Sequence, residues 1–135
     1  GEDLILNRNM FIEAVLPSSI MRKLSDEEMN AYRAPDIESD DRQPLLNWPR
    51  QIPIEGEPEE IVTLVNDYGA FMATSQMPKL FINAEPGSIL TGRQREFCRT
   101  WPNQQEVTVK GLHSIQEDSP IEIGQAIAKW YKIFA

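Results

Sequence analysis

The sequence predicts an α/β fold with a parallel sheet, to which this chain contributes two strands. Two apolar runs, residues 79–84 and 106–110, have the length and composition of buried strands. Helical patterns come before, between and after them, and this alternation is typical of parallel α/β sheets. A parallel sheet of two strands leaves an edge and apolar faces uncovered, so we expect the other strands to come from elsewhere.

The first third of the chain predicts two helices and a winding connection. Apolar residues recur at helical spacing up to Pro17, which predicts a first helix ending near Leu16 and a turn over residues 16–19. The residues on that face are Leu4, Phe11, Ile12 and Val15. Ser25 and Glu28 form a capping box, and the helix that they open should stop before Pro35. Residues 35–58 are rich in proline and acids, which disfavours regular structure.

The rest of the chain carries the alternating pattern. Pro58 and neighbouring glutamates open a helix with one apolar face. That face consists of Ile61, Leu64, Val65, Tyr68 and Met72. Residues 85–87 form a turn after the first strand, residues 93–99 form a short helix, and residues 111–113 end the second strand. Ser119, Pro120 and Glu122 predict a second capping box, which opens the last helix.

Composition excludes several classes of protein. The 135 residues include 41% hydrophobic and 25% charged ones, and no apolar run approaches the length of a membrane span. The net charge of -8 argues against nucleic-acid binding. One cysteine and one histidine make neither a disulfide nor a zinc-ligand cluster, so we expect a cytoplasmic protein without a metal. The start at Gly1, without a signal-peptide pattern, reads as a start inside a longer protein.

His113 is the candidate catalytic residue. It follows the second predicted strand, and catalytic groups of open α/β sheets gather at the carboxyl ends of strands. Histidine can exchange a proton near neutral pH. Position alone leaves two readings open: a catalytic base, or a loop histidine without a task.

Six short stretches carry a resemblance to a known family. In order they are FIE (11–13), VLP (15–17), WPRQIPI (48–54), KLFINAEPG (79–87), FCRTWPN (97–103) and VKGLHSIQEDSP (109–120). Together they resemble the carboxy-terminal half of haloalkane dehalogenases, which have an α/β-hydrolase core with an inserted helical cap. The comparison makes residues 1–55 the later part of the cap, and residues 56–135 the carboxy-terminal part of the core.

The resemblance implies a two-step hydrolysis of small haloalkanes to alcohol and halide. An Asp carboxylate displaces the halide and forms an ester, and a histidine activates the water that hydrolyses the ester. His113 matches that histidine. The family's nucleophilic Asp, and the Asn and Trp that hold the halide, match no part of this chain, so an amino-terminal half is the implied partner. No cofactor and no metal are implied.

The acid that partners the histidine has no clear match in the chain. Its common place in α/β hydrolases, after the strand at residues 79–84, holds Gly87. Glu85 lies close to that place and reads more simply as a turn carboxylate. Glu117 and Asp118 read as helix-dipole and solvation groups. We therefore expect the acid in the amino-terminal half.

The resemblance also implies a mostly apolar substrate pocket, as small haloalkanes require. Its residues are Phe11, Val15, Ser19, Trp48, Pro49, Ile52, Ser88, Ile89 and Ser114. Without the resemblance, Phe11, Val15 and Ile89 could equally be core residues. Several relatives carry bulky residues in place of Ser19 and Ser114, so a pocket that these two face should be wider or wetter.

Three alternatives stay open. A coelenterazine-type luciferase has the same fold and shares the GLH and QED stretches and a cap segment similar to residues 16–24. An epoxide hydrolase would use cap tyrosines, and only Tyr32 offers one. A non-catalytic fragment, which would associate or unfold without cooperativity, is the third.

Overall fold

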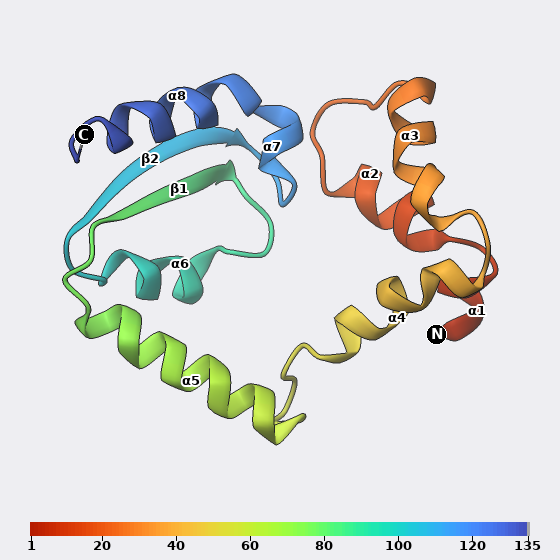
Figure 1. The fold of residues 1–135 in the computed structure, drawn as a ribbon, viewed down its shortest axis with the longest axis horizontal. Coiled ribbons are helices and arrows are strands. Elements are labelled where there is room, and N and C mark those ends of the chain that lie inside the picture. Colours follow the sequence, from red (N-terminus) through yellow and green to blue (C-terminus); the bar gives the residue numbers. More distant parts are fainter. Residues whose placement is uncertain (135) are drawn as a thin grey trace. The chain divides into compact units, whose positions relative to one another are not determined.

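The computed structural model describes residues 1–134, which form two compact units (Figure 1). Unit 1 contains Gly1–Ser18 and Lys23–Tyr68. Unit 2 contains Ser19–Arg22 and the chain from Gly69 onward. The long helix α5, Glu59–Thr74, begins in the first unit and ends in the second. The short segment Ser19–Arg22 therefore groups with the later part of the chain, and its hydrogen bonds reach residues 95 to 97 positions further on.

Unit 1 is made of short helical elements. They are α1 (Glu2–Leu6), a π-helical turn (Phe11–Val15), α2 (Leu16–Ser18), α3 (Asp26–Arg33), two 3₁₀ turns (Ala34–Asp36 and Asp40–Arg42) and α4 (Gln43–Arg50). The capping box that opens α3 is confirmed, because Ser25 Oγ accepts from the Glu28 N–H at 3.2 Å and the Glu28 carboxylate accepts from the Ser25 N–H at 2.7 Å. The helix ends before Pro35, as predicted.

Two predictions for unit 1 are wrong. The first helix is not continuous, because Asn9 adopts a φ of 49°, which breaks a helix, and Pro17 lies inside α2 rather than in a turn. The predicted winding connection contains helix α4, with Pro44 in its first turn, where the missing N–H costs no helical hydrogen bond. The proline content alone does not reveal this.

Unit 2 is the predicted parallel α/β arrangement. Strand β1 (Lys79–Pro86) pairs in parallel with β2 (Gln104–Gly111), from Lys79 opposite Gln104 to Pro86 opposite Gly111. Helix α6 (Gly92–Arg99) connects the strands, and α8 (Pro120–Tyr131) follows them. In Figure 1 the two strands run between α6 and α8. The prediction of two parallel strands with helices around them is confirmed.

The region after β2 departs from the prediction. A short helix, α7 (Ile115–Asp118), comes before α8. The predicted capping box of α8 is wrong, because the Ser119 hydroxyl donates to the Lys110 carbonyl at 2.7 Å and makes no cap hydrogen bond to the helix. Ser119 thus ties α8 to the end of β2, a tertiary role that a local pattern cannot show.

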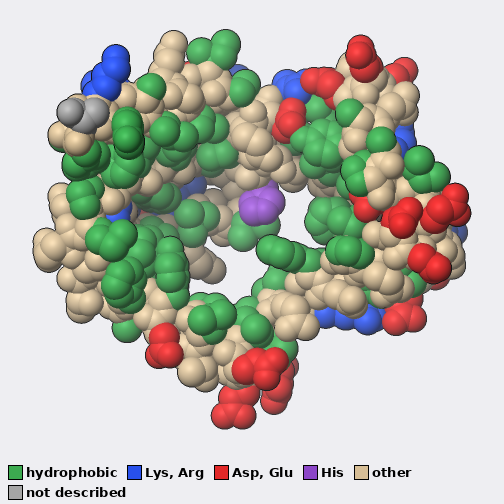
Figure 2. Space-filling view, viewed as in Figure 1, with side chains coloured by type: hydrophobic (Ala, Val, Ile, Leu, Met, Phe, Trp, Pro, Cys, Tyr) green, Lys and Arg blue, Asp and Glu red, His purple; other side chains and the backbone are tan. Residues whose placement is uncertain are grey.

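Few side chains are buried, and large apolar ones stay exposed on the helices. The buried apolar residues are Ile12, Ile20, Leu24, Met29, Leu46 and Val109. The exposed ones on α5 and α8 include Leu64, Val65, Tyr68, Phe71, Ile121, Ile127 and Tyr131. Figure 2 shows many such side chains, in green, on the visible face. Surfaces of this kind mark contacts with other protein. Among residues 1–134, no helix has both the length and the apolar character needed to cross a bilayer.

Candidate active site

A cavity of about 200 Å³ lies where β1 and β2 end, and His113 lines it. The other residues around it are Ile82, Ala84, Gly87, Ser88, Leu90, Leu112 and Ile115. They come from both strands and from the loops that follow them, which is the place where parallel α/β sheets bind ligands. The lining is mostly apolar, with His113 and Ser88 as its polar side chains. Such a site suits a small apolar ligand, with His113 as the one basic side chain among the described residues that line the cavity.

Hydrogen bonds fix the backbone of His113, and its imidazole ring is exposed. The His113 N–H donates to the Ser19 carbonyl at 3.1 Å, and the Ser114 N–H donates to the same oxygen at 3.0 Å. The side chain is exposed, as the purple atoms in Figure 2 show. Within residues 1–134 no side-chain hydrogen bond of His113 is formed. The hydrogen bonds of the described residues therefore fix the backbone of His113 and not its imidazole ring.

The loop after β1 is held by Arg95 from α6. Its guanidinium donates to the carbonyls of Ala84 at 2.9 Å, Pro86 at 3.3 Å and Leu90 at 3.2 Å. The Gly87 N–H donates to the Gly111 carbonyl at 3.0 Å, which joins the ends of the two strands. Arg95 thus positions the loop that carries Ser88, and the sequence reading did not single it out.

Gly87 occupies a place that other residues would strain. Its φ is +73°, and a Cβ built there would lie 2.7 Å from Nη2 of Arg95 and 3.0 Å from the Ala84 carbonyl oxygen. An aspartate at this place, where the resemblance puts the usual acid, would have to displace the arginine and adopt a left-handed backbone. The local geometry is built for glycine.

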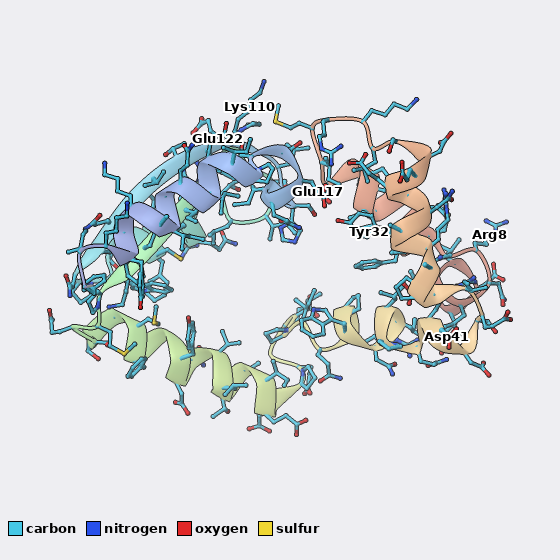
Figure 3. The ribbon with its side chains drawn as sticks, turned by 45° about the horizontal axis from the view of Figure 1, so that its top comes forward. Arg8, Tyr32, Asp41, Lys110, Glu117 and Glu122 are labelled. Carbon is cyan, nitrogen blue, oxygen red and sulfur yellow. The ribbon has the colours of Figure 1, made fainter. Side chains whose placement is uncertain are left out.

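The three nearby carboxylates do not reach the His113 ring. Glu85 is exposed at the end of β1. The carboxylate of Glu117, which is labelled on α7 in Figure 3, accepts a hydrogen bond from Nη2 of Arg22 at 2.6 Å. Asp118 accepts hydrogen bonds from the backbone N–H groups of Met21 and Arg22, each at 3.0 Å. Glu117 and Asp118 therefore have specific tertiary partners, beyond the helix-dipole role that the sequence suggested.

The predicted pocket residues fall into two groups. In unit 2, Ser88 lines the cavity and Ile89 follows it with 64% of its surface exposed. The hydroxyls of Ser19 and Ser114 are 2.7 Å apart; Ser114 follows His113 in sequence, and the Ser19 carbonyl accepts from the His113 N–H. In unit 1, Phe11 and Val15 lie on the π-helical turn, Trp48 and Pro49 lie on α4, and Ile52 follows it. The structure thus brings Ser19, Ser88 and Ser114 near His113, and the role of all nine residues in a substrate pocket stays a prediction.

Residues 1–134 contain no group of three or more His, Cys, Asp or Glu side chains that could hold a metal ion. Cys98 lines a separate, open hollow of about 590 Å³ along α6. Burial raises the pKa of its thiol, although a backbone hydrogen bond opposes that shift. A raised thiol pKa disfavours the reactive thiolate, so Cys98 lacks the character of a nucleophile.

Comparison with known proteins gives a consistent answer. No protein-family model matches the chain. A haloalkane dehalogenase from Sphingobium indicum is 56% identical over 133 residues, which cover 98% of this chain and 45% of the relative. One from Mycolicibacterium smegmatis is 51% identical, with 98% and 43% covered. The coelenterazine h 2-monooxygenase of Renilla reniformis is 43% identical, with 94% and 42% covered.

A solved structure extends the match to the fold. The crystal structure of an ancestral haloalkane dehalogenase superposes with a TM-score of 0.91 at 41% identity, and covers 96% of this chain and 46% of that protein. The fold and the place of His113 define the carboxy-terminal part of an α/β-hydrolase. More particularly, the chain is a homologue of the carboxy-terminal part of haloalkane dehalogenases. It spans less than half the length of the curated relatives it matches.

Experiments on the site are best made on a longer chain, in which further residues can cover the exposed apolar faces of unit 2. We therefore define the fusion protein as this chain joined to the amino-terminal part of the Sphingobium indicum relative that it does not match. At 56% identity over the matched part, most contacts across the join should be retained.

Gly87→Ala should destabilise the fusion protein by about 1–3 kcal/mol, because the new Cβ meets Arg95 and Ala84 in a left-handed backbone. The measurement is urea unfolding. The control is Gly124→Ala in α8, where no atom lies within 4 Å of a built Cβ and alanine favours the helix. Equal stability of the two variants would contradict the strain assigned to residue 87.

Proposed function

We propose that the protein to which this chain belongs hydrolyses small haloalkanes to alcohol and halide, with His113 as the general base. The observation that carries the proposal is the position of His113, exposed at the carboxyl ends of two parallel strands in a mostly apolar cavity. The 56% identical relative named haloalkane dehalogenase supports the same activity. A cytoplasmic location is part of the proposal, supported by the single cysteine.

The chemistry divides between this chain and the amino-terminal half. An Asp carboxylate of that half attacks the carbon that bears the halogen, the carbon–halogen bond breaks, and halide leaves as the ester forms. The imidazole of His113 then takes a proton from water as the water oxygen adds to the ester carbonyl. The alcohol leaves, the carboxylate is restored, and the proton passes from His113 to solvent. Water and a carboxylate suffice, so the proposal includes no cofactor and no metal.

The substrate pocket in this proposal draws on both units. Ser19, Ser88, Ile89 and Ser114 would line it beside His113, and Phe11, Val15, Trp48, Pro49 and Ile52 would close it from the cap. The exposure of Trp48, at 81%, and of Ile52, at 55%, supports a role for these apolar side chains in contact with a substrate or with other protein. The Asn and Trp that hold the leaving halide would come from the amino-terminal half.

A second candidate is a luciferase that oxidises coelenterazine. The 43% identity to the Renilla reniformis monooxygenase over 94% of this chain favours it. The higher identity to the two dehalogenases, 56% and 51%, is the reason to rank hydrolysis first.

Halide release from 1-bromobutane by the fusion protein tests the two candidates together. We expect bromide and butanol in equal amounts over many turnovers, and no light on addition of coelenterazine. The intact Sphingobium indicum relative serves as the positive control for bromide release. Light without bromide would support the luciferase, and neither product from a folded fusion protein would contradict both candidates.

A further inference from the structure

The segment Ser19–Arg22 is bound to the region after β2 at several points. Both carboxylate oxygens of Asp118 accept from the Met21 N–H at 3.0 Å, and Oδ1 also accepts from the Arg22 N–H at 3.0 Å. Arg22 donates through Nε to the Glu117 carbonyl, and through Nη2 to its carboxylate, each at 2.6 Å. A segment from the first sixth of the chain is thus fixed against α7 (Figure 3 labels Glu117).

The hydrogen bonds to Asp118 also lower the pKa of its carboxyl. Burial alone would raise that pKa, but hydrogen bonds from backbone N–H groups, among them those of Met21 and Arg22, outweigh burial, and the pKa lies below its usual value. The carboxylate is therefore ionised at neutral pH, and charged acceptors make the stronger hydrogen bonds. Asp118 thus holds the backbone of Met21 and Arg22, two residues from Ser19, to α7.

Ser19, in the same segment, binds the backbone of the histidine. Its carbonyl accepts from the N–H groups of His113 and Ser114, and its hydroxyl is hydrogen-bonded to that of Ser114 at 2.7 Å. His113 and Ser114 are therefore fixed to Ser19, and Asp118 fixes the same segment through Met21 and Arg22. We call this set of contacts, from residues 19–22 to residues 113, 114, 117 and 118, the clasp.

We infer that Asp118 is a positioning residue, which orients His113 for ester hydrolysis by fixing the backbone of Met21 and Arg22. The Ser19 carbonyl of the same segment is thereby kept in place to bind the His113 and Ser114 N–H groups. The inference rests on the proposed function of His113. Asp118 does not act as the acid that pairs with the imidazole, because its oxygens are engaged by backbone N–H groups. It acts on the second chemical step alone, since the first step uses the Asp of the amino-terminal half.

Asp118→Asn in the fusion protein separates the two steps. Asparagine has an NH2 group in place of one carboxylate oxygen, and this group donates hydrogen bonds and cannot accept them from the backbone N–H groups. We expect the first bromide per enzyme to appear at the unaltered rate, and later turnovers to slow by about 10- to 100-fold, as for a misplaced catalytic group. Rapid-quench bromide release gives both rates, and the burst amplitude gives the fraction of folded sites. Asp118→Glu, which keeps the charge, should recover part of the loss.

Glu122→Gln is the matched control, because it removes one negative charge from the first turn of α8, where its side chain is exposed. It should leave both rates unchanged. The inference is overturned if Asp118→Asn turns over like Glu122→Gln, or if its first and later turnovers fall by the same factor, as a loss of folded protein would cause.

Hydrogen exchange separates this inference from the proposed function. In the unaltered fusion protein, the amides of Met21, Arg22 and His113 should exchange slowly, because each donates a hydrogen bond within the clasp. Asp118→Asn should speed the exchange of all three, while Glu122→Gln speeds none. Fast exchange at Met21 and Arg22 in the unaltered protein overturns the clasp, even where Asp118→Asn does not fold. Slow exchange in a fusion protein that releases no bromide would retain the clasp and reject only the proposed function.

Discussion

Replacing His113 with glutamine should convert the fusion protein from a catalyst into a reagent that releases one bromide and stops. Glutamine retains a polar side chain of similar reach but cannot take a proton from water at neutral pH. The ester from the first step should therefore accumulate. Intact-protein mass spectrometry should find one butyl group per chain, and bromide should stop at one equivalent.

The matched control for this variant is Gln116→Ala, an exposed neighbour on α7 that does not line the cavity. It should turn over many times and show no stable ester. Continued turnover by His113→Gln would show that another group is the base. A complete absence of the first bromide would mean that the histidine also serves the displacement step.

The second large effect is expected from Lys79, whose charged end is enclosed by carbonyl groups. The residue is 7% exposed, and Nζ donates to the carbonyls of Ser75 at 2.6 Å, Met77 at 3.0 Å and Pro102 at 3.0 Å. Lys79→Met keeps the apolar stem and removes all three donors. Because hydrogen bonds to charged groups contribute about 1.5–3 kcal/mol each and do not add fully, we expect a loss of about 3 kcal/mol in the free energy of unfolding.

Urea unfolding of the fusion protein measures that loss. Lys110→Met is the control, since Lys110 is an exposed lysine on the neighbouring strand β2. Its replacement should change the stability by less than about 0.5 kcal/mol, as for ordinary surface sites. If the two variants unfold at the same urea concentration, the three carbonyl contacts do not anchor the start of β1.

The parts of the fold that the sequence predicted are those with local signals. The apolar run at the centre of β1, the capping box of Ser25 and Glu28, and the alternation of helices with strands all depend on neighbours within a few residues. Two features of the fold were not predicted from the sequence. The break at Asn9 depends on a backbone conformation that several residue types tolerate, and α4 forms although it contains Pro44 and Pro49. Neither has a distinctive pattern.

For the candidate site, the sequence predicted the position of His113 but not what holds it. Asp118 and Met21 are 97 positions apart, and Arg95 binds carbonyls of a loop whose path the sequence does not specify. A carboxylate at the carboxyl end of a helix is unfavourable because it faces the negative end of the helix dipole. Asp118 ends α7, so a prediction of α7 would have indicated that Asp118 has a stabilising partner elsewhere. The missing information was therefore tertiary.

The exposed apolar faces of α5 and α8 bear on the fate of the protein in a cell. Side chains such as Leu64, Phe71 and Ile121, each more than half exposed, resemble the surfaces that chaperones bind in unfinished proteins. Proteases remove chains that continue to present them. The abundance of this protein should thus depend on whether other protein covers these faces. Substitutions on these two helices would then change the amount of the protein without replacing His113 or a residue that lines its cavity.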